Sequence, residues 1–194
     1  MSPGVLYGVG LGPGDPELIT LKAARLIASS PIVAYPALAG ADSFARRIAS
    51  GLITPDHREI AIDVPMTTAR APAQEAYDAG ADEIATALRA GQDVVCLCEG
   101  DPFFYGSFMY LFARLSAEFD THVIPGVTSV TACAARAGMP LAARNERVTT
   151  LSAPAIRSSN SASGSGPGRI VTRSLRAASG MPARAAQAVT LVTP

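Results

Sequence analysis

Apolar and polar residues follow two different periods along the first 150 residues of the chain. Short apolar runs that are typical of β-strands occupy residues 5–10, 32–35, 59–64, 93–98 and 122–124. Helical patterns occupy residues 16–28, 43–49, 72–90, 107–117 and 127–137. This alternation predicts right-handed crossover connections and a mostly parallel sheet in an α/β fold.

Several residues mark where the predicted helices begin and end. Asp15 is placed to cap the first helix and Pro16 to occupy its first turn, with Leu18, Leu21 and Ala24 on one face. Gly91 and Gly138 follow the last residues of two later helical patterns, where glycine commonly ends a helix.

The alternating pattern is lost beyond about residue 152. Residues 158–168 are rich in Ser, Gly, Asn and Pro, which is the composition of a flexible linker. We therefore expect an N-terminal α/β domain over residues 1–124 and the start of a second, incomplete α/β domain over residues 125–154. Residues 155–194 are expected to be an atypical, poorly ordered tail.

Composition and charge narrow the class of protein. Hydrophobic residues make up 48% of the 194 and charged residues 16%, which suits a globular α/β protein. Residues 1–146 hold 10 basic and 16 acidic side chains, a net charge of −6, whereas residues 147–194 hold six arginines and no acid. These arginines are scattered and lack interleaved aromatics, so we expect no nucleic-acid partner. No apolar run is long enough to span a bilayer and no basic secretory start is present, so we expect a cytoplasmic protein without a membrane partner.

The metal-ligating residue types do not form a recognisable site. The three cysteines are an odd number without a regular framework, and Cys96 and Cys98 point to one face of a predicted strand. We interpret them as small buried hydrophobic residues. His57 and His122 have no second histidine at ligand spacing, so no metal is expected.

Three glycine-containing turns follow the carboxyl ends of predicted strands. They occupy residues 8–16 (GVGLGPGDP), 99–106 (EGDPFFYG) and 125–129 (PGVTS). In a parallel sheet all three should lie along one edge, the edge at which open α/β sheets bind ligands. Each turn could simply connect a strand to a helix, but three at one edge favour a ligand site.

The ligand of these turns is not expected to be a phosphate. A Walker loop needs Gly-Lys-Ser/Thr, and the only lysine is Lys22, inside a predicted helix. The dinucleotide fingerprint that starts at Gly8 would need glycine where Pro13 stands, and Asp15 would oppose a pyrophosphate. A neutral or cationic ligand, such as a sulfonium cofactor, suits the loops better.

The three turns, in this order and spacing, resemble the signatures of the tetrapyrrole methyltransferases. The stretch from Cys98 to Met109 and the Ser43-x-x-Arg46-Arg47-Ile48 segment are similar to the subgroup that methylates the C(20) position in cobalamin biosynthesis. The resemblance implies a tetrapyrrole methyltransferase-like fold of two α/β domains and S-adenosylmethionine as the methyl donor. It also implies a small-molecule tetrapyrrole substrate and a homodimer.

Functional residues are carried over by the resemblance. It implies donor contacts from Pro13, Gly100, Asp101, Phe104, Thr128 and Ser129. Asp101 or Tyr105 would take the proton that the methylated carbon loses, although a structural role in the turn is favoured for Asp101. Pro36 stands where the uroporphyrinogen-III branch of the family has an acid, which removes one candidate base. The candidates for binding the substrate's carboxylates are Arg46, Arg47, Arg70 and Arg144.

Three alternatives remain at this stage. The chain could methylate another carbon of a corrin precursor, it could be a nucleotide-binding or interaction module without catalysis, or it could be a truncated form that binds ligand without turnover. The last alternative follows from the segment beyond Ser152, whose composition lacks Asp, Glu and Lys and resembles an out-of-frame reading.

Overall fold

The computed structural model describes residues 2–38, 40–65, 70–142, 144, 147–151, 170–173 and 188–192. The chain divides into two compact units, Met1–Thr128 and Ser129–Pro194, and each unit is described by itself.

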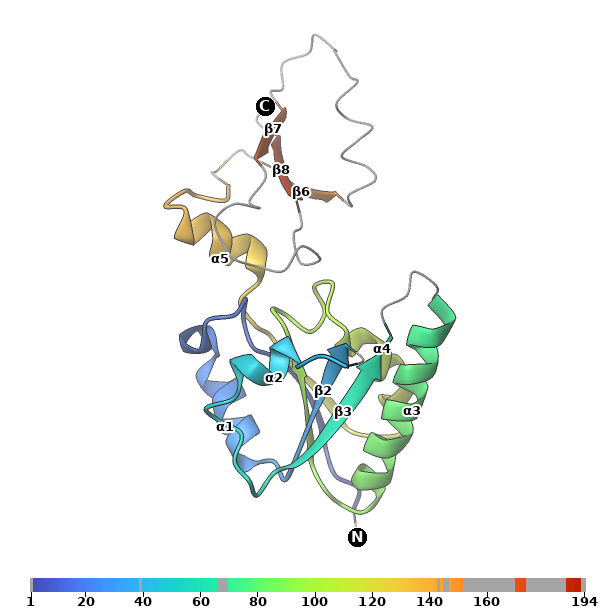
Figure 1. Cartoon of the computed structure of the whole chain (residues 1–194). Helices are drawn as coiled ribbons and strands as arrows, with labels where there is room; N and C mark the ends of the chain where they lie inside the picture. The colour runs from blue at the N-terminus through green and yellow to red at the C-terminus, as the bar shows by residue number, and fades with distance from the viewer. Residues whose placement is uncertain are drawn as a thin grey trace. The chain divides into compact units, whose positions relative to one another are not determined.

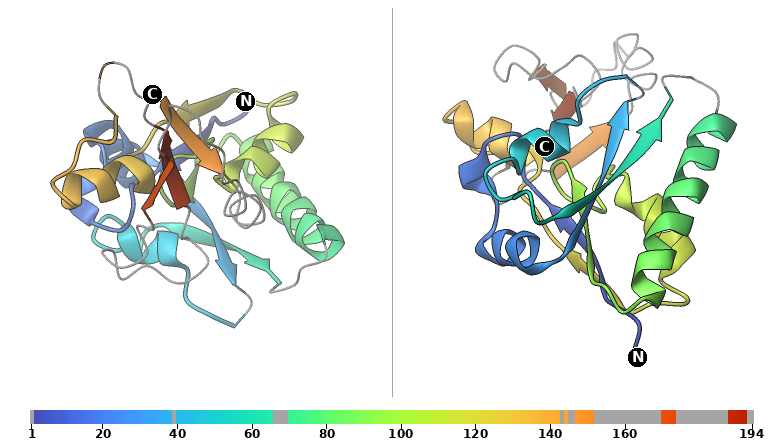
Figure 2. Two further views of the ribbon diagram at one scale, coloured as in Figure 1. Left: turned by 90° about the horizontal axis from the view of Figure 1, so that it is seen from above. Right: turned by 60° about the horizontal axis from the view of Figure 1, so that its bottom comes forward.

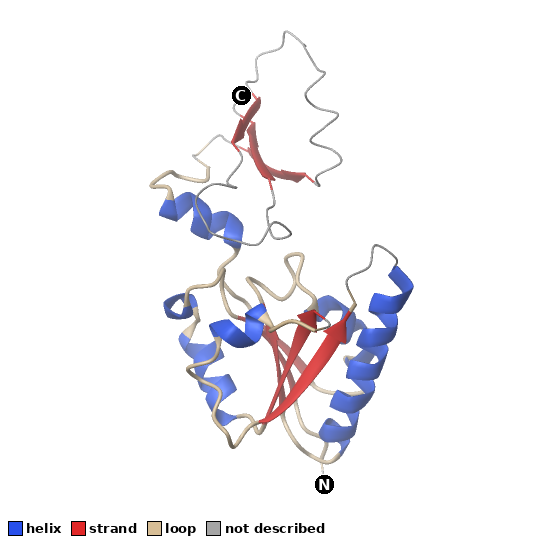
Figure 3. Ribbon diagram, viewed as in Figure 1, coloured by secondary structure: helices blue, strands red, loops and turns tan. Residues whose placement is uncertain are grey.

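The first unit is a five-stranded parallel sheet with helices on both faces (Figures 1 and 3). Its strands are β1 (Leu6–Gly10), β2 (Ile32–Leu38), β3 (Arg58–Val64), β4 (Val94–Cys98) and β5 (Thr121–Ile124), in the spatial order β3-β2-β4-β1-β5. Its helices are the 3₁₀ turn η1 (Pro16–Leu18), α1 (Leu21–Ser29), α2 (Phe44–Ile48), α3 (Arg70–Arg89) and α4 (Phe108–Leu115). The predicted α/β class and the parallel sheet are confirmed.

The alternation of side chains along the strands divides the core into two layers. Cys96 and Cys98 of β4 belong to the layer covered by α3 and α4, whereas Val95 and Leu97 belong to the layer covered by α1 and α2. Figure 2 shows α3 along one face of the sheet and α1 on the other. All four side chains are buried, so β4 is apolar at every position because both of its faces are covered.

The first predicted helix is in fact two elements, which corrects the sequence prediction. Asp15 caps only the 3₁₀ turn, because its Oδ1 accepts from the Glu17 backbone N–H at 2.9 Å. The α-helix starts anew at Leu21, capped by Thr20, whose hydroxyl accepts from Ala23 N–H at 3.2 Å. The buried face of α1 therefore contains Ala23 and Ile27, and Leu21 is largely exposed.

Strand β2 continues three residues beyond the predicted end at residue 35. Its ladder with β4 stops at Ala34, whereas its ladder with β3 continues to Leu38. Pro36 is therefore accommodated in the part of the strand that pairs on one side only, since proline lacks the N–H that a second ladder would need.

The second unit contains helix α5 (Ser129–Arg136) and a three-stranded antiparallel sheet. The sheet consists of β6 (Arg147–Leu151), β7 (Ile170–Arg173) and β8 (Ala188–Val192), in the order β6-β8-β7. The sequence pattern predicted no element for β6, β7 or β8, although all three segments are rich in the β-branched residues that favour strands. The predicted linker at residues 158–168 lies outside the described residues. So does the remainder of the expected tail at residues 155–194, apart from β7 and β8.

Candidate functional site

The strand order creates a switch point between β1 and β4, which are adjacent in the sheet. From β1 the chain passes through α1 on one face to β2, and from β4 it passes through α4 on the other face to β5. Open α/β sheets bind ligands outside the carboxyl ends of the strands at such a point. The first two glycine turns lie at these two strand ends, and the third follows β5, the other neighbour of β1.

Backbone hydrogen bonds join the first and second turns. Gly12 and Gly100 bond to each other twice, with the Gly100 N–H donating to the Gly12 carbonyl at 2.8 Å and the reverse bond at 3.2 Å. The Leu11 N–H donates to the Cys98 carbonyl at 2.9 Å. The two turns therefore form one continuous backbone surface.

Glycine is required at Gly10 because three backbone segments meet there. A Cβ on Gly10 would lie 2.6 Å from both the Gly100 carbonyl oxygen and the Gly126 nitrogen. A Cβ on Gly126 would lie 2.1 Å from that same Gly100 oxygen. Real Cβ atoms do not approach backbone this closely, so these glycines allow the three turns to pack directly against one another.

Gly100 is required for its backbone conformation. Its φ of +63° lies in the left-handed region, and among the described residues a Cβ at this position would meet only the Val127 carbonyl oxygen, at 4.0 Å. Gly100 therefore leaves open space beside the backbone of the second turn, which a ligand can use.

Asp101 holds the second and third turns together. Its Oδ1 accepts from the backbone N–H groups of Phe103 at 2.9 Å and Phe104 at 3.1 Å, and its Oδ2 accepts from the Gly126 N–H at 3.1 Å. Both carboxylate oxygens are thus engaged in fixing backbone. This geometry agrees with the structural role that the sequence favoured for Asp101.

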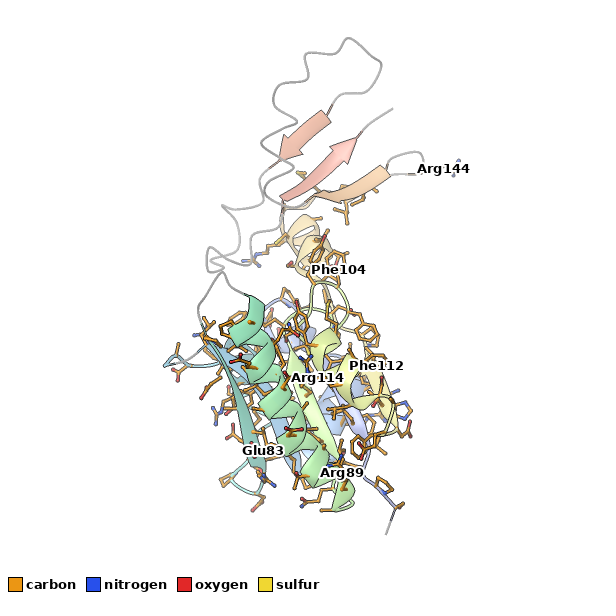
Figure 4. The ribbon with its side chains drawn as sticks, turned by 90° about the vertical axis from the view of Figure 1, so that its right-hand side faces the viewer. Glu83, Arg89, Phe104, Phe112, Arg114 and Arg144 are labelled. Atoms are coloured by element: carbon orange, nitrogen blue, oxygen red, sulfur yellow. The ribbon has the colours of Figure 1, made fainter. Side chains whose placement is uncertain are left out.

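Three aromatic residues follow Asp101 and differ in how they are held. Phe103 contacts Phe112 edge-on, with ring centroids 5.1 Å apart, and so anchors the loop to α4. Phe104 and Tyr105 contact each other edge-on at 5.2 Å and are both exposed. Figure 4 labels Phe104 on the loop at this end of the first unit and Phe112 on α4. Tyr105 has a backbone φ of +55°, which residues other than glycine rarely adopt. Such strained residues are found most often at functional sites.

Glu99 is a candidate site residue to which the sequence assigned no role. It directly follows the last residue of β4 and precedes Gly100. The residue as a whole is exposed, but the surrounding protein reduces the hydration of its carboxyl, which raises the carboxyl pKa; the charge of Arg47 opposes this rise. The sequence signal for Glu99 is its place as an acidic residue directly after a central strand of the sheet.

The four candidate arginines have different surroundings. Arg46 is engaged by Glu59, with its Nε 2.5 Å and its Nη2 2.8 Å from the two carboxylate oxygens. Arg47 is exposed, and its guanidinium lies over the Phe44 ring, 4.9 Å from the centroid. A Cβ on Gly14 would lie 3.2 Å from the Phe44 ring, so this ring and Arg47 stand beside the first turn. Arg144 is exposed in the second unit, and the side chain of Arg70 lies outside the described residues.

The structure thus brings together most of the predicted donor-site residues. Gly100, Asp101 and Phe104 form the second turn, Pro13 follows the bonded Gly12, and Thr128 ends the third turn, two residues after the bonded Gly126. Ser129 is the first residue of α5 and belongs to the second unit.

The described part of the chain contains neither a metal-binding cluster nor a membrane-spanning helix. No three His, Cys, Asp or Glu side chains there lie close enough together to hold a metal ion. No described helix has both the length and the apolar character that crossing a membrane requires.

The chain has an open parallel sheet with three glycine turns packed at its switch point. This arrangement is typical of ligand-binding α/β proteins. The family model of the tetrapyrrole (corrin/porphyrin) methylases matches residues 5–189, and the chain belongs to this family. The match extends beyond residue 152, where the alternating pattern of the sequence is lost.

Individual relatives and a solved structure agree with this assignment. The chain is 40% identical to a precorrin-2 C(20)-methyltransferase of Sinorhizobium sp over 156 residues, which are 76% of this chain and 64% of the relative. It is 32% identical to a cobalt-precorrin-2 C(20)-methyltransferase of Salmonella typhimurium, covering 78% of this chain and 65% of the relative. The structure of a cobalt precorrin-4 methyltransferase superposes with a TM-score of 0.57 at 30% identity, covering 72% of this chain and 53% of that chain. The chain therefore spans somewhat less than two thirds of the length of these curated relatives.

Proposed function

We propose that this protein transfers a methyl group from S-adenosylmethionine to the C(20) meso carbon of precorrin-2 or its cobalt-containing counterpart, in cobalamin biosynthesis. The packing of Gly10, Gly100 and Gly126 around the switch point is the observation that carries the proposal, because it builds one binding surface from the three family signatures. The names of the two relatives above support the choice of reaction and substrate.

The residues of the three turns fit this donor. The turns contain no cation that would repel a sulfonium, and Gly100 leaves open space beside its backbone. In the proposal, Pro13, Gly100, Asp101 and Phe104 contact the donor from the first two turns, and Thr128 and Ser129 contact it from the third. The donor supplies an electrophilic methyl on a good leaving group.

The protein's task is then mainly to position two large ligands and to remove one proton. Of the candidate arginines, Arg47 is best suited to bind the substrate's carboxylates, since it is exposed and lies beside the first turn. Arg46 is less suited because Glu59 already occupies its guanidinium. Tyr105 and Phe104 offer exposed aromatic surface to the macrocycle.

Calorimetric titration of the full chain with S-adenosylhomocysteine tests the donor site, and incubation with S-adenosylmethionine and precorrin-2 tests the reaction. We expect saturable binding and a singly methylated product whose new methyl lies at C(20). Absence of binding would contradict the donor site, and a methyl at another carbon would favour a different corrin-pathway reaction. Binding without product would favour a chain that binds ligand without turnover.

The homodimer is also a proposal, based on the family alone. Sedimentation at micromolar protein concentration should show twice the chain mass, and a monomer would contradict it.

A further inference from the structure

Two acidic residues stand two positions apart in the second turn, and the structure gives them different surroundings. Asp101 accepts three backbone hydrogen bonds, and these bonds connect the second and third turns. No described residue donates a hydrogen bond to the Glu99 carboxylate. Of these two residues, therefore, Glu99 is the one whose carboxylate can accept a proton without loss of the hydrogen bonds that connect the turns.

The position of Glu99 is fixed by the backbone on both sides of it. The Cys98 carbonyl accepts from Leu11 and the Gly100 N–H donates to Gly12, so the residue between them is held at the switch point. By the alternation of β4, Glu99 follows the positions of Val95 and Leu97 and lies on the α1 and α2 face of the sheet. The same face carries Phe44 and Arg47 on α2.

The surroundings of Glu99 raise the pKa of its carboxyl above the ordinary value, because the protein around it reduces its hydration. The surrounding protein makes the charged form less favourable, and Arg47 limits this effect. The other titratable side chains of the adjoining turns are Asp15, Asp101 and Tyr105. A carboxylate that is partly desolvated, exposed to a ligand and without a hydrogen-bond donor is suited to general base catalysis.

We propose that Glu99 is the catalytic base that accepts the proton lost by the substrate's meso carbon. The inference rests on the proposed function. In the reaction, the meso carbon uses an electron pair of the macrocycle to form the bond to the methyl, and the carbon–sulfur bond breaks with its electrons going to sulfur. The carbon then carries both the methyl and its original hydrogen, and the macrocycle has gained one positive charge. Transfer of that hydrogen to Glu99 as a proton returns the C–H electron pair to the macrocycle, and the carboxyl later releases the proton to water.

This assignment replaces Asp101 and Tyr105 as the first choice for the base. Asp101 remains essential to the turn because it fixes Gly126, and Tyr105 remains an exposed aromatic residue beside Phe104. Neither role needs a proton to be taken from the substrate.

The test compares Glu99→Gln and Glu99→Asp with Glu75→Gln, an exposed acid on α3 that serves as the matched control. Glu99→Gln should lower single-turnover methyl transfer by about 10²–10⁴-fold. Its affinity for S-adenosylhomocysteine should stay within about 2-fold of wild type, as expected when an interaction is needed only in the transition state. Glu99→Asp should recover part of the rate, and Glu75→Gln should match wild type.

The pH profile distinguishes a base from a merely structural residue. In wild type the single-turnover rate should rise with pH through one inflection and then level off, because only ionised Glu99 accepts the proton. Glu99→Gln should lose this inflection. Arg47→Met should move it to higher pH, since removing the cation makes ionisation of Glu99 less favourable.

The outcomes separate this inference from the proposed function. Wild-type protein that binds donor but never methylates precorrin-2 would overturn the proposed function and the inference with it. Active wild-type protein with an equally active Glu99→Gln variant would overturn the inference alone. A slow Glu99→Gln variant that keeps the wild-type pH profile would also overturn it, because the residue would then act through structure.

Discussion

At the scale of single residues, chemically similar side chains have different roles because of what they contact. Asp15 and Asp101 both follow a glycine in a strand-to-helix turn, and both accept backbone hydrogen bonds. Asp15 caps only its own short turn, whereas Asp101 also reaches Gly126, 25 positions away. The longer contact makes Asp101 part of the architecture of the site.

Replacing Asp101 by Asn tests this difference. The Asn oxygen can still accept from the backbone of its own turn, but its NH₂ group faces the Gly126 N–H and leaves that donor without an acceptor. We expect a loss of about 1–3 kcal/mol in the free energy of unfolding, together with weaker S-adenosylhomocysteine binding. Asp15→Asn should change both by little, because Asn caps helices well. Urea denaturation and calorimetry measure the two effects, and a larger effect from Asp15→Asn would reverse the ranking.

Gly10 offers a second test at the residue scale. A methyl group there would press on the backbone of both other turns, which cannot move aside as a flexible side chain would. Gly10→Ala should lower the free energy of unfolding by about 1–3 kcal/mol and weaken donor binding. Gly51→Ala is the matched control, because a Cβ at Gly51 meets no atom of the described residues within 4 Å. Equal stability of the two variants in urea denaturation would show that the turns are not in direct contact.

At the scale of elements, an ion pair fastens the short helix α2 to strand β3. Arg46 contacts Glu59 through two hydrogen bonds, and this contact lowers the pKa of the Glu59 carboxyl. A lowered folded-state pKa contributes stability above the pKa of Glu59 in the unfolded chain, and this stability is lost as the pH falls through the folded-state value. The pair is partly exposed, so its contribution is small.

Arg46→Met should therefore lower the free energy of unfolding at pH 7 by about 0.5–1 kcal/mol. The difference from wild type should shrink as the pH is lowered through the acidic range in which Glu59 is protonated. Arg58→Met, which removes the more exposed pair with Glu83, should have a smaller effect at every pH. Urea denaturation between pH 3 and pH 7, about the range over which a carboxylate titrates, measures both. A deficit for Arg46→Met that does not change with pH would contradict the role of the ion pair.

At the scale of the whole molecule, the first unit has a complete core of its own. Both hydrophobic layers of its sheet are built from residues before position 128, and every strand of the parallel sheet lies in this unit. The three turns are connected by hydrogen bonds within the same unit.

We therefore expect residues 1–128 to fold when expressed alone. The fragment should show a cooperative urea transition and the circular dichroism of a mixed α/β protein. Its Gly10→Ala variant should be destabilised as it is in the full chain, because the contacts of Gly10 lie inside the unit. An unfolded fragment would show that residues 129–194 are needed for the first unit to form.

The sequence by itself determined the α/β class, the five parallel strands and the three turns, because hydrophobic period and glycine spacing are local properties of the chain. It also led to the family through the order of those turns. It failed where the deciding partner is distant along the chain or where the local signal is short. The apolar pattern joined η1 to α1, because the single capping residue Thr20 is a short signal within one continuous helical period. It also passed over β6, β7 and β8, three short strands that form their sheet only by pairing with one another. Only the tertiary structure decided that Arg46 is engaged by Glu59 while Arg47 is exposed. It also decided that Gly126 donates to Asp101, whereas no residue in the described part of the chain donates a hydrogen bond to Glu99. The roles of these side chains depend on contacts that form only when the strands and turns come together.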